Sequence, residues 1–328
     1  MTDQKDLLDL NIGDKINHYL VVTKAEVKLA KNNREYLNLE LRDRSVSLNA
    51  KMWDSFNEFK DKETSGRVVK VLGLLEEFMG TTQIRIEKIR FATEKENINP
   101  EDFLPKSQRD LQVMIEELNS RIKELKDDYL KELIKQMLTG ENFDKFIKVP
   151  AGKSWHHSYI HGLLEHTLEI IKICDLMCNI HSELNRDLLI TGAILHDYGK
   201  IEELTAGISF DYTDKGKLLG HIVIASNQIE KAIDNIKNFP EELKIQLLHL
   251  ILSHQGKLEH ASPVEPKTLE AIALYHADEL SAKVNAYKLA IRAEENKEDN
   301  WTKFLPLANT SLYTKRIIEE GKLKDTLF

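Results

Sequence analysis

Polar residues that can bind a metal ion end or interrupt several apolar, helix-like segments in the second half of the chain. In TGAILHDYGK, His196 and Asp197 directly follow an apolar run, and His166 lies within GLLEHTLEII. Burying an imidazole or a carboxylate is costly unless each group finds a partner. A metal ion can satisfy both kinds of group at once. The other residues in this pattern are His221, His254 and Asp278.

The number of such residues separates a metal site from a simpler interpretation. A single buried histidine is most often a core residue with its own hydrogen-bond partner. Histidines and aspartates on five predicted helices would each need such a partner, whereas one shared metal centre satisfies them all. Imidazole and carboxylate ligands without thiolate suit Mn²⁺, Fe²⁺, Co²⁺ or Zn²⁺. All histidines except His18 lie after residue 150, so the sequence places the chemistry in the second half of the chain.

In the order H…HD…D, these residues resemble the HD-domain metal-dependent phosphohydrolase superfamily. HDYGK matches the HDxGK motif of that superfamily, and GKLLGHI and ILSHQG agree with it downstream, over about residues 150–290. The two intervening histidines match the subset that binds two metal ions. The resemblance favours Mn²⁺. It implies one ion held by His166, His196, Asp197 and Asp278, and a second held by His221 and His254, with Asp197 bridging.

The resemblance also implies the chemistry. Two ions about 3.5–4 Å apart can activate a water molecule and clamp a phosphate for in-line displacement. Asp197, as the bridging ligand, is therefore expected to be a catalytic residue. Lys200 follows His196 by one helical turn, so its charge could neutralise a phosphate oxygen or its proton could reach a leaving group. The alternative is a surface lysine. Gly199 is expected to leave room for a substrate.

Three further side chains are candidates for substrate binding. His156 and His157 resemble a pair that precedes the HD core in one nuclease subfamily, which implies contact with phosphate. Gln255 stands where related chains often carry a second histidine, and its amide could hydrogen-bond a phosphate. The remaining histidines of this half are expected to lie away from the centre: His161, His181, His249, His260 and His276.

Residues 11–92 show the period-2 pattern of β-strands. Leu37, Leu39 and Leu41 alternate with polar residues, and RVVKVLGLLEEF and TQIRIEKIRF repeat the pattern. About five strands, with a short helical piece near SFNEFK, predict a small Greek-key barrel of the OB type. Such barrels bind single-stranded nucleic acid through aromatic and basic side chains. Trp53 and Phe78 could instead belong to the core. The candidates are Tyr36, Arg42, Arg44, Lys51, Trp53 and Phe78.

The segments around these two parts complete the predicted organisation. TEKENINPEDFLPKS has the composition of a linker, and apolar residues from Leu111 to Met137 predict one connecting helix of about thirty residues. A coiled-coil dimer contact along this helix, and hence a homo-oligomer, is an alternative interpretation. The fold is predicted to be multidomain α+β. It comprises an OB-type β-barrel (1–92), a linker and connecting helix (93–142), an all-α HD domain (143–293) and a C-terminal tail (294–328).

Composition bounds the class of protein. The 328 residues are 41% hydrophobic and 30% charged, as in ordinary globular proteins, and the net charge of −8 argues against a general nucleic-acid coat. No segment reaches the roughly 18 uncharged apolar residues of a membrane span. The N-terminus lacks the apolar core of a signal peptide. Cys174 and Cys178 lie one helical turn apart, a spacing that favours two thiols in a reducing cytoplasm.

The combination of a barrel, a helical connector and an HD domain resembles the YhaM family of bacterial 3′-to-5′ exoribonucleases over nearly the whole chain. The resemblance implies hydrolysis of single-stranded RNA from the 3′ end to nucleoside 5′-monophosphates, with single-stranded DNA as a further substrate. An alternative is an HD phosphodiesterase or nucleotidase that acts on small or cyclic nucleotides, with the barrel as a regulatory module. A third interpretation is an RNA-binding adaptor with a degenerate HD core.

Overall fold

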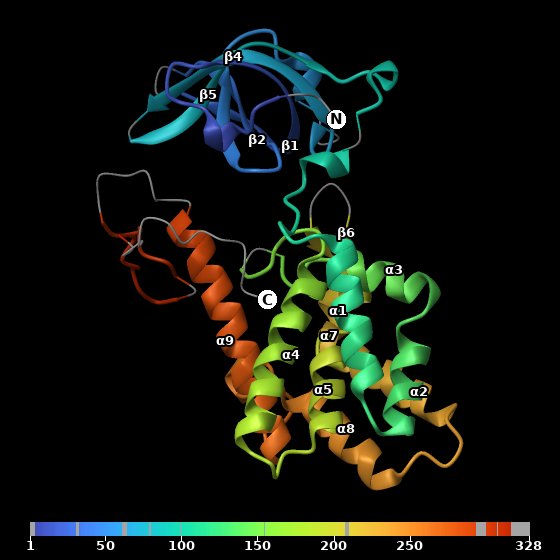
Figure 1. Ribbon diagram of the computed structural model, residues 1–328. Coiled ribbons are helices and arrows are strands. Elements are labelled where there is room, and N and C mark those ends of the chain that lie inside the picture. The colour runs from blue at the N-terminus through green and yellow to red at the C-terminus, as the bar shows by residue number, and fades with distance from the viewer. Residues whose placement is uncertain are drawn as a thin grey trace.

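The computed structural model describes residues 4–30, 33–60, 64–78, 80–98, 100–153, 155–206, 210–292, 300–306 and 308–315. An all-β barrel comes first in the chain, and a helical domain follows it (Figure 1). The predicted α+β class, with a β-barrel before a helical domain, is confirmed.

The five strands of the barrel close on themselves in the order β1-β2-β3-β5-β4. All pairs are antiparallel except β3 with β5, which is parallel. The leucines of β2 point inward and are fully buried, as the period-2 pattern predicts. Closure therefore pairs every strand on both sides and leaves the alternate residues on the outer surface. The strands are β1 (Lys15–Leu29), β2 (Glu35–Arg42), β3 (Ser47–Met52), β4 (Val68–Phe78) and β5 (Thr81–Phe91).

The linker contacts both domains through two neighbouring side chains. It contains two short 3₁₀ turns, η4 (Glu94–Glu96) and η5 (Pro100–Phe103). Phe103 packs with buried valines of the barrel. Leu104, the next residue, packs with Ile160 and Phe210 of the helical domain. The predicted linker is thus anchored at both ends by apolar contacts.

The predicted single connecting helix is wrong, because the segment forms two helices, α1 (Leu111–Glu124) and α2 (Asp128–Met137). The Asp187 carboxylate accepts hydrogen bonds from the amides of Lys126 and Asp127 at 2.6 and 2.7 Å, which satisfies the backbone where the helix breaks. Both helices bury their apolar faces in the core of the helical domain. That burial leaves the coiled-coil alternative without its apolar seam.

Helices α4, α5 and α9 pack against one another in the helical domain (Figure 1). Helix α8 packs on α5 and α9, and α7 packs on α6 and α8. The domain predicted to be all-α also contains a small hairpin of β6 (Leu204–Ala206) and β7 (Phe210–Tyr212). The helices are α3 (Gly140–Lys148), α4 (Gly162–Ile180), α5 (Arg186–Leu195), α6 (Lys200–Glu203), α7 (Asp214–Asp234), α8 (Glu241–Ser253) and α9 (Leu269–Arg292).

The described part of the C-terminal tail folds back on itself. Trp301 pairs with Tyr313, and Leu305 pairs with Thr310, through isolated β-bridges. We call residues 300–306 and 308–315 the C-terminal hairpin. Both cysteines are free thiols. Among the residues that the structure describes, no helix has the length and apolar character needed to span a membrane.

Candidate metal centre

The six predicted ligands come from five helices, and several of them lie at helix ends. His196 and His254 cap the C-termini of α5 and α8, so each side chain projects beyond the apolar run that precedes it. His221 follows Gly220, whose positive φ of 72° kinks α7 at this point. His166 lies in the second turn of α4, and Asp278 lies within α9.

The structure brings all six side chains together around the Asp197 carboxylate. Its Oδ2 lies 3.3 Å from His196 Nε2 and 3.7 Å from His166 Nε2. Its Oδ1 lies 3.4 Å from His221 Nε2 and 3.7 Å from His254 Nε2. Asp278 Oδ1 lies 3.0 Å from His166 Nε2. Asp197 therefore presents one oxygen to each half of the cluster.

In each of the four histidines, Nδ1 lies within hydrogen-bond distance of an oxygen atom. His196 Nδ1 lies 2.9 Å from the Ala193 carbonyl, and His254 Nδ1 lies 2.7 Å from the Ile251 carbonyl. The equivalent partners of His166 and His221 are Ser281 Oγ at 3.0 Å and Glu203 Oε1 at 3.1 Å. A histidine that donates its Nδ1–H in this way directs an unprotonated Nε2 into the cluster.

The unsatisfied atoms of the cluster fit a divalent metal ion. Buried Nε2 atoms of His166, His196 and His221, and Oδ1 of Asp197, have no hydrogen-bond partner in the described structure. Such atoms are costly to bury alone and are the ligands that divalent transition metals accept. Three groups have their ligand atoms within 4.8 Å of one another. Two of them share Asp197: His166, His196 and Asp197, and then Asp197, His221 and His254. The third is His156, His157 and His166.

Burial and charge act differently on the members of the cluster. Burial lowers the pKa of His166 well below its usual value and that of His254 to about 4. Burial opposes charge on His196 and Asp197 too. At His196 the attraction of Asp197 outweighs burial and raises the pKa. At Asp197 the charges of Lys200 and His196 outweigh burial and hold the pKa well below its usual value.

The predicted substrate-binding residues of this domain border the cluster. Lys200 is buried, and its Nζ lies 2.6 Å from Asp197 Oδ2. The rings of His156 and His157 have centroids 4.8 and 5.0 Å from that of His166. Gln255 Nε2 lies 3.4 Å from His254 Nε2.

Two pockets flank the cluster and share Trp155, His156 and Lys200. The first, of about 400 Å³, we call the α9 pocket. The second, of about 260 Å³, we call the α6 pocket. The α9 pocket is further lined by His254, Gln255, Tyr275, Asp278, Tyr287 and Asn309. The α6 pocket is further lined by Gly152, Lys153, Glu203, Tyr212 and His221.

Three residues that hold the ligands in place were missed in the sequence. Ser281 Oγ donates to Glu169 Oε2 at 2.7 Å, so a relay runs from His166 through Ser281 to Glu169. Glu203 accepts from both the backbone amide and Nδ1 of His221. Glu169 follows His166 by three residues and Ser281 follows Asp278 by three. That spacing places each on the face of its ligand and could have identified both.

The expected role of Gly199 is wrong. A Cβ at this residue would lie 2.0 Å from the His221 carbonyl oxygen and 2.9 Å from the Ala225 nitrogen. The missing side chain therefore leaves room for the backbone of α7, and not for a substrate. The close approach brings His221 to the end of α5, beside Asp197.

The remaining histidines have other surroundings. His249 Nε2 accepts from the Lys267 amide at 2.9 Å. His161 Nδ1 contacts the Ile147 carbonyl, and His276 and His181 are exposed. His260, expected to be an ordinary surface residue, is exposed but also lines the α9 pocket.

On the barrel, most of the predicted nucleic-acid contacts gather on one part of the surface. Trp53 is 41% exposed and stacks on Tyr36 with ring centroids 4.8 Å apart. Lys51 Nζ lies 4.3 Å from the centroid of the Phe78 ring, which is also exposed. Neither aromatic is therefore a core residue. We call Tyr36, Lys51, Trp53 and Phe78 the barrel patch.

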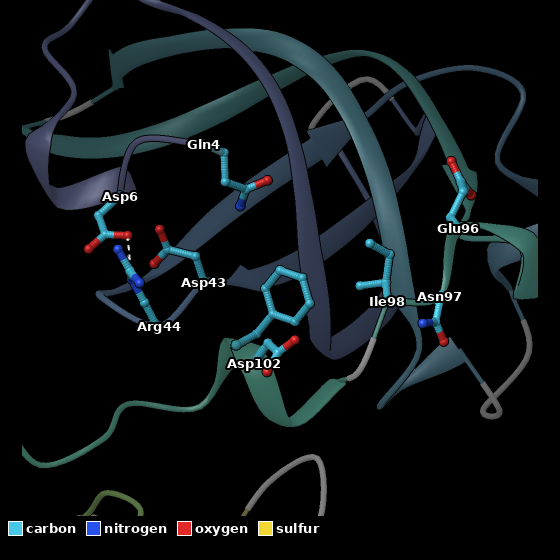
Figure 2. A pocket seen from close by; sticks show the side chains of 9 residues that line it. Gln4, Asp6, Asp43, Arg44, Glu96, Asn97, Ile98 and Asp102 are labelled. Carbon is cyan, nitrogen blue, oxygen red and sulfur yellow. Dashed lines mark hydrogen bonds and ion pairs between the residues drawn. The ribbon is translucent and has the colours of Figure 1, made fainter. Parts of the chain in front are cut away.

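Arg44 lies apart from the barrel patch, before β3, whereas Trp53 follows that strand. Its Nε is paired with Asp6 Oδ1 at 2.8 Å (Figure 2). The pocket around this pair, of about 230 Å³, is also lined by the carboxylates of Asp43, Glu96 and Asp102. These acids make the surroundings of Arg44 unfavourable for a phosphate. The pKa of Arg42, at the end of β2, is lowered by burial.

A five-stranded barrel joined to a helical domain with a histidine and aspartate cluster defines a class of protein: a metal-dependent HD phosphohydrolase with an OB-fold domain. The HD domain model matches residues 163–283, and the OB-fold nucleic acid binding domain model matches residues 21–92. Together, the HD domain and the cluster indicate dependence on a divalent metal.

Comparison with known proteins narrows this class. The chain is 33% identical over 310 residues to the 3′-5′ exoribonuclease YhaM of Bacillus subtilis (strain 168), covering 94% of this chain and 98% of that protein. The chain therefore belongs to the YhaM family. The second OB-fold domain of replication protein A from Methanococcus maripaludis is 19% identical and covers 26% of this chain and 92% of that domain, with a TM-score of 0.21 that is too low to carry an argument.

Proposed function

We propose that this protein is a metal-dependent 3′-5′ exoribonuclease that shortens single-stranded RNA and releases nucleoside 5′-monophosphates. The observation that carries the proposal is the end-to-end similarity to the exoribonuclease YhaM, together with the complete cluster of six ligands in the HD domain. An RNA substrate and two free thiols favour a cytoplasmic location.

Two divalent ions, with Mn²⁺ as our first choice, suit the two triads that share Asp197. His166, His196, Asp197 and Asp278 would hold one ion, and Asp197, His221 and His254 the other. When bound, such a pair supplies an activated water and positive charge for the phosphate.

The chain's own side chains would place the phosphodiester. Lys200 keeps its positive charge in a buried setting, because the attraction of Asp197 outweighs burial and raises its pKa. A charged group in such a setting interacts strongly with phosphate oxygens. His156 and Gln255 line the α9 pocket and add nitrogen donors around the same space. The ring of His157 lies behind them, with its centroid 5.0 Å from that of His166 and its Nε2 3.2 Å from Glu169 Oε2. We assign these four residues to phosphate binding.

The barrel would bind the RNA strand upstream of the cleaved bond. Aromatic rings stack on any base, and lysines track the backbone, so the barrel patch suits a single strand of any sequence. The acidic surroundings of Arg44 give it no comparable role.

The proposal is tested with an oligoribonucleotide labelled at its 5′ end and incubated with Mn²⁺. We expect a ladder of products shortened one nucleotide at a time from the 3′ end, and none with Asp197→Asn. A single-stranded DNA of the same sequence measures the preference for RNA. Hydrolysis of cyclic or small nucleotides without a ladder would support the alternative of a small-nucleotide phosphodiesterase.

A further inference from the structure

We propose that the α9 pocket binds the base of the 3′-terminal nucleotide and that the α6 pocket binds the nucleotide before it. This inference rests on the proposed function and adds to it the place and direction of the substrate. The cleaved phosphodiester would then lie at Lys200 and His156, two of the three side chains that both pockets share.

The α9 pocket has the size and the surface that a nucleobase needs. Its volume of about 400 Å³ falls within the range of small-molecule sites. Tyr275 and Tyr287 of α9 and Trp155 line it, and the rings of Trp155 and Tyr287 meet edge to face with centroids 6.5 Å apart. Half-buried aromatic rings beside a metal cluster are suited to stack on a base, because every base presents a π-face.

One of these rings is held in place by a glycine. A Cβ at Gly256 would lie 2.2 Å from the Tyr275 ring, and the φ of +78° at this residue also favours glycine. Gly256 directly follows Gln255, which places Tyr275 beside the loop that carries His254 and Gln255. The ring is therefore fixed relative to the cluster.

The surroundings of the two pockets set the direction of the strand. The α6 pocket includes Tyr212 of the β6–β7 hairpin, and Phe210 of the same hairpin packs on Leu104 of the linker that leads from the barrel. Figure 1 shows β6 beside this linker. RNA that leaves the barrel along the linker would reach the α6 pocket first. The lining of the α9 pocket includes Ala308 and Asn309 of the C-terminal hairpin, and no described residue of the linker or of the β6–β7 hairpin is among its lining residues, which suits the end of a strand.

The test compares three RNA decamers: an intact strand, a strand with an abasic 3′-terminal residue, and a strand with an abasic penultimate residue. The rate of the first cleavage, as kcat/KM, is measured for the wild type, Tyr287→Leu and the matched variant Tyr212→Leu. For the wild type we expect the terminal abasic residue to lower kcat/KM about tenfold or more, the size of one lost base–aromatic contact.

The variants assign each base to a pocket. In Tyr287→Leu, the strand with the terminal abasic residue should have nearly the same kcat/KM as the intact strand, because the stacking ring is already missing. The penultimate abasic residue should lower kcat/KM in this variant as much as it does in the wild type. In Tyr212→Leu the penultimate abasic residue should have little effect on kcat/KM, and the terminal one should keep its full effect. The proposal would be overturned if Tyr287→Leu removed the effect of the penultimate abasic residue and Tyr212→Leu that of the terminal one. It would also be overturned if the wild type cleaved the terminally abasic strand as fast as the intact one. The wild-type comparison holds even if a variant does not fold.

Failure of the proposed function looks different. In that case the wild type would shorten none of the three strands, so there would be no kcat/KM values to compare between them. Binding of a nucleoside 5′-monophosphate, compared with ribose 5-phosphate, then tests the α9 pocket without turnover. We expect about tenfold tighter binding of the nucleotide, and equal affinities would contradict a base-binding pocket.

Discussion

At the scale of single residues, the cluster depends on atoms that face away from it. Each ligand histidine has an oxygen at Nδ1, and two of these oxygens belong to side chains, Ser281 and Glu203. Because that hydrogen bond selects the tautomer and orients the ring, we propose that Ser281 and Glu203 are positioning residues for the predicted metal ligands.

Glu203→Gln should weaken Mn²⁺ binding by about 10- to 100-fold, since a neutral amide supports His221 less well than a carboxylate. Glu202→Gln is the matched control, because the neighbouring carboxylate contacts Lys215 and Gln228 away from the cluster. Binding is measured by isothermal titration of the metal-free protein. Equal affinities for the two variants would contradict the positioning role.

The pH dependence of the metal-free protein follows from the buried histidines. Burial lowers the pKa of His254 to about 4 from 6.5. Between these two values the unfolded chain binds more protons than the folded one, so stability falls as the pH falls, by about 3 kcal/mol for this group. His166 and His156 act in the same direction, and His196, whose pKa is raised, opposes them.

We therefore expect the urea midpoint of the metal-free protein to drop between pH 6.5 and pH 4, and to drop less in His254→Gln. A midpoint that stays constant over this range would show that these imidazoles are not buried in neutral form.

At the scale of elements, close approach of α6 and α7 places two ligands together. Gly199 allows the His221 carbonyl to lie against the backbone after α5, and Gly220 redirects α7. The two glycines therefore allow Asp197, after the end of α5, to lie close to His221, after the kink in α7.

Gly199→Ala should separate these two ends, because its Cβ would overlap the His221 carbonyl at 2.0 Å. We expect a loss of stability of about 1–3 kcal/mol, as for other overpacked sites, and weaker Mn²⁺ binding. Both are measured on the purified variant by urea unfolding and metal titration. A variant with wild-type stability would contradict this account of the glycine.

The sequence predicts the elements and the ligands better than it predicts their partners. Periodicity identifies the strand with Leu37, Leu39 and Leu41, and the spacing of His166, His196, Asp197 and Asp278 identifies the centre, because both are local or motif-like signals. The break between α1 and α2 depends on Asp187, about sixty residues away in the chain. Contacts between segments that are far apart in the chain cannot be predicted from the periodicity of the sequence.

Arg44 is a second example of that limit. Its position in a β-rich segment predicts a nucleic-acid contact, yet Arg44 is paired with Asp6 in the folded chain, and Asp43 and Asp9 also act on its charge. The α9 pocket likewise joins Trp155 to Tyr287 across more than 130 residues. Only packing reveals these neighbours.

At the scale of the whole molecule, we propose that the barrel holds the RNA strand and the helical domain cuts it. The linker contacts both through Phe103 and Leu104, so the barrel and the cluster belong to one connected structure. Affinity for long RNA should therefore depend on the barrel patch, and hydrolysis of a short diester should not.

Trp53→Ala should lower affinity for a 20-nucleotide RNA by roughly tenfold, since one base–aromatic contact is worth about 1–3 kcal/mol. Hydrolysis of a dinucleotide should stay unchanged. Arg44→Ala serves as the comparison and should change neither value, because the acids around it disfavour phosphate. Fluorescence anisotropy gives the affinities. Equal effects of the two substitutions would contradict the barrel patch as the binding surface.

The central claim is that one cluster of histidines and aspartates holds the catalytic metals. The number of Mn²⁺ ions bound per chain, measured by equilibrium titration with electron paramagnetic resonance, tests it most directly. We predict two ions for the wild type and for the surface control Asp234→Asn, and fewer than one for Asp197→Asn. Unchanged binding by Asp197→Asn, or no binding by the wild type, would contradict the account.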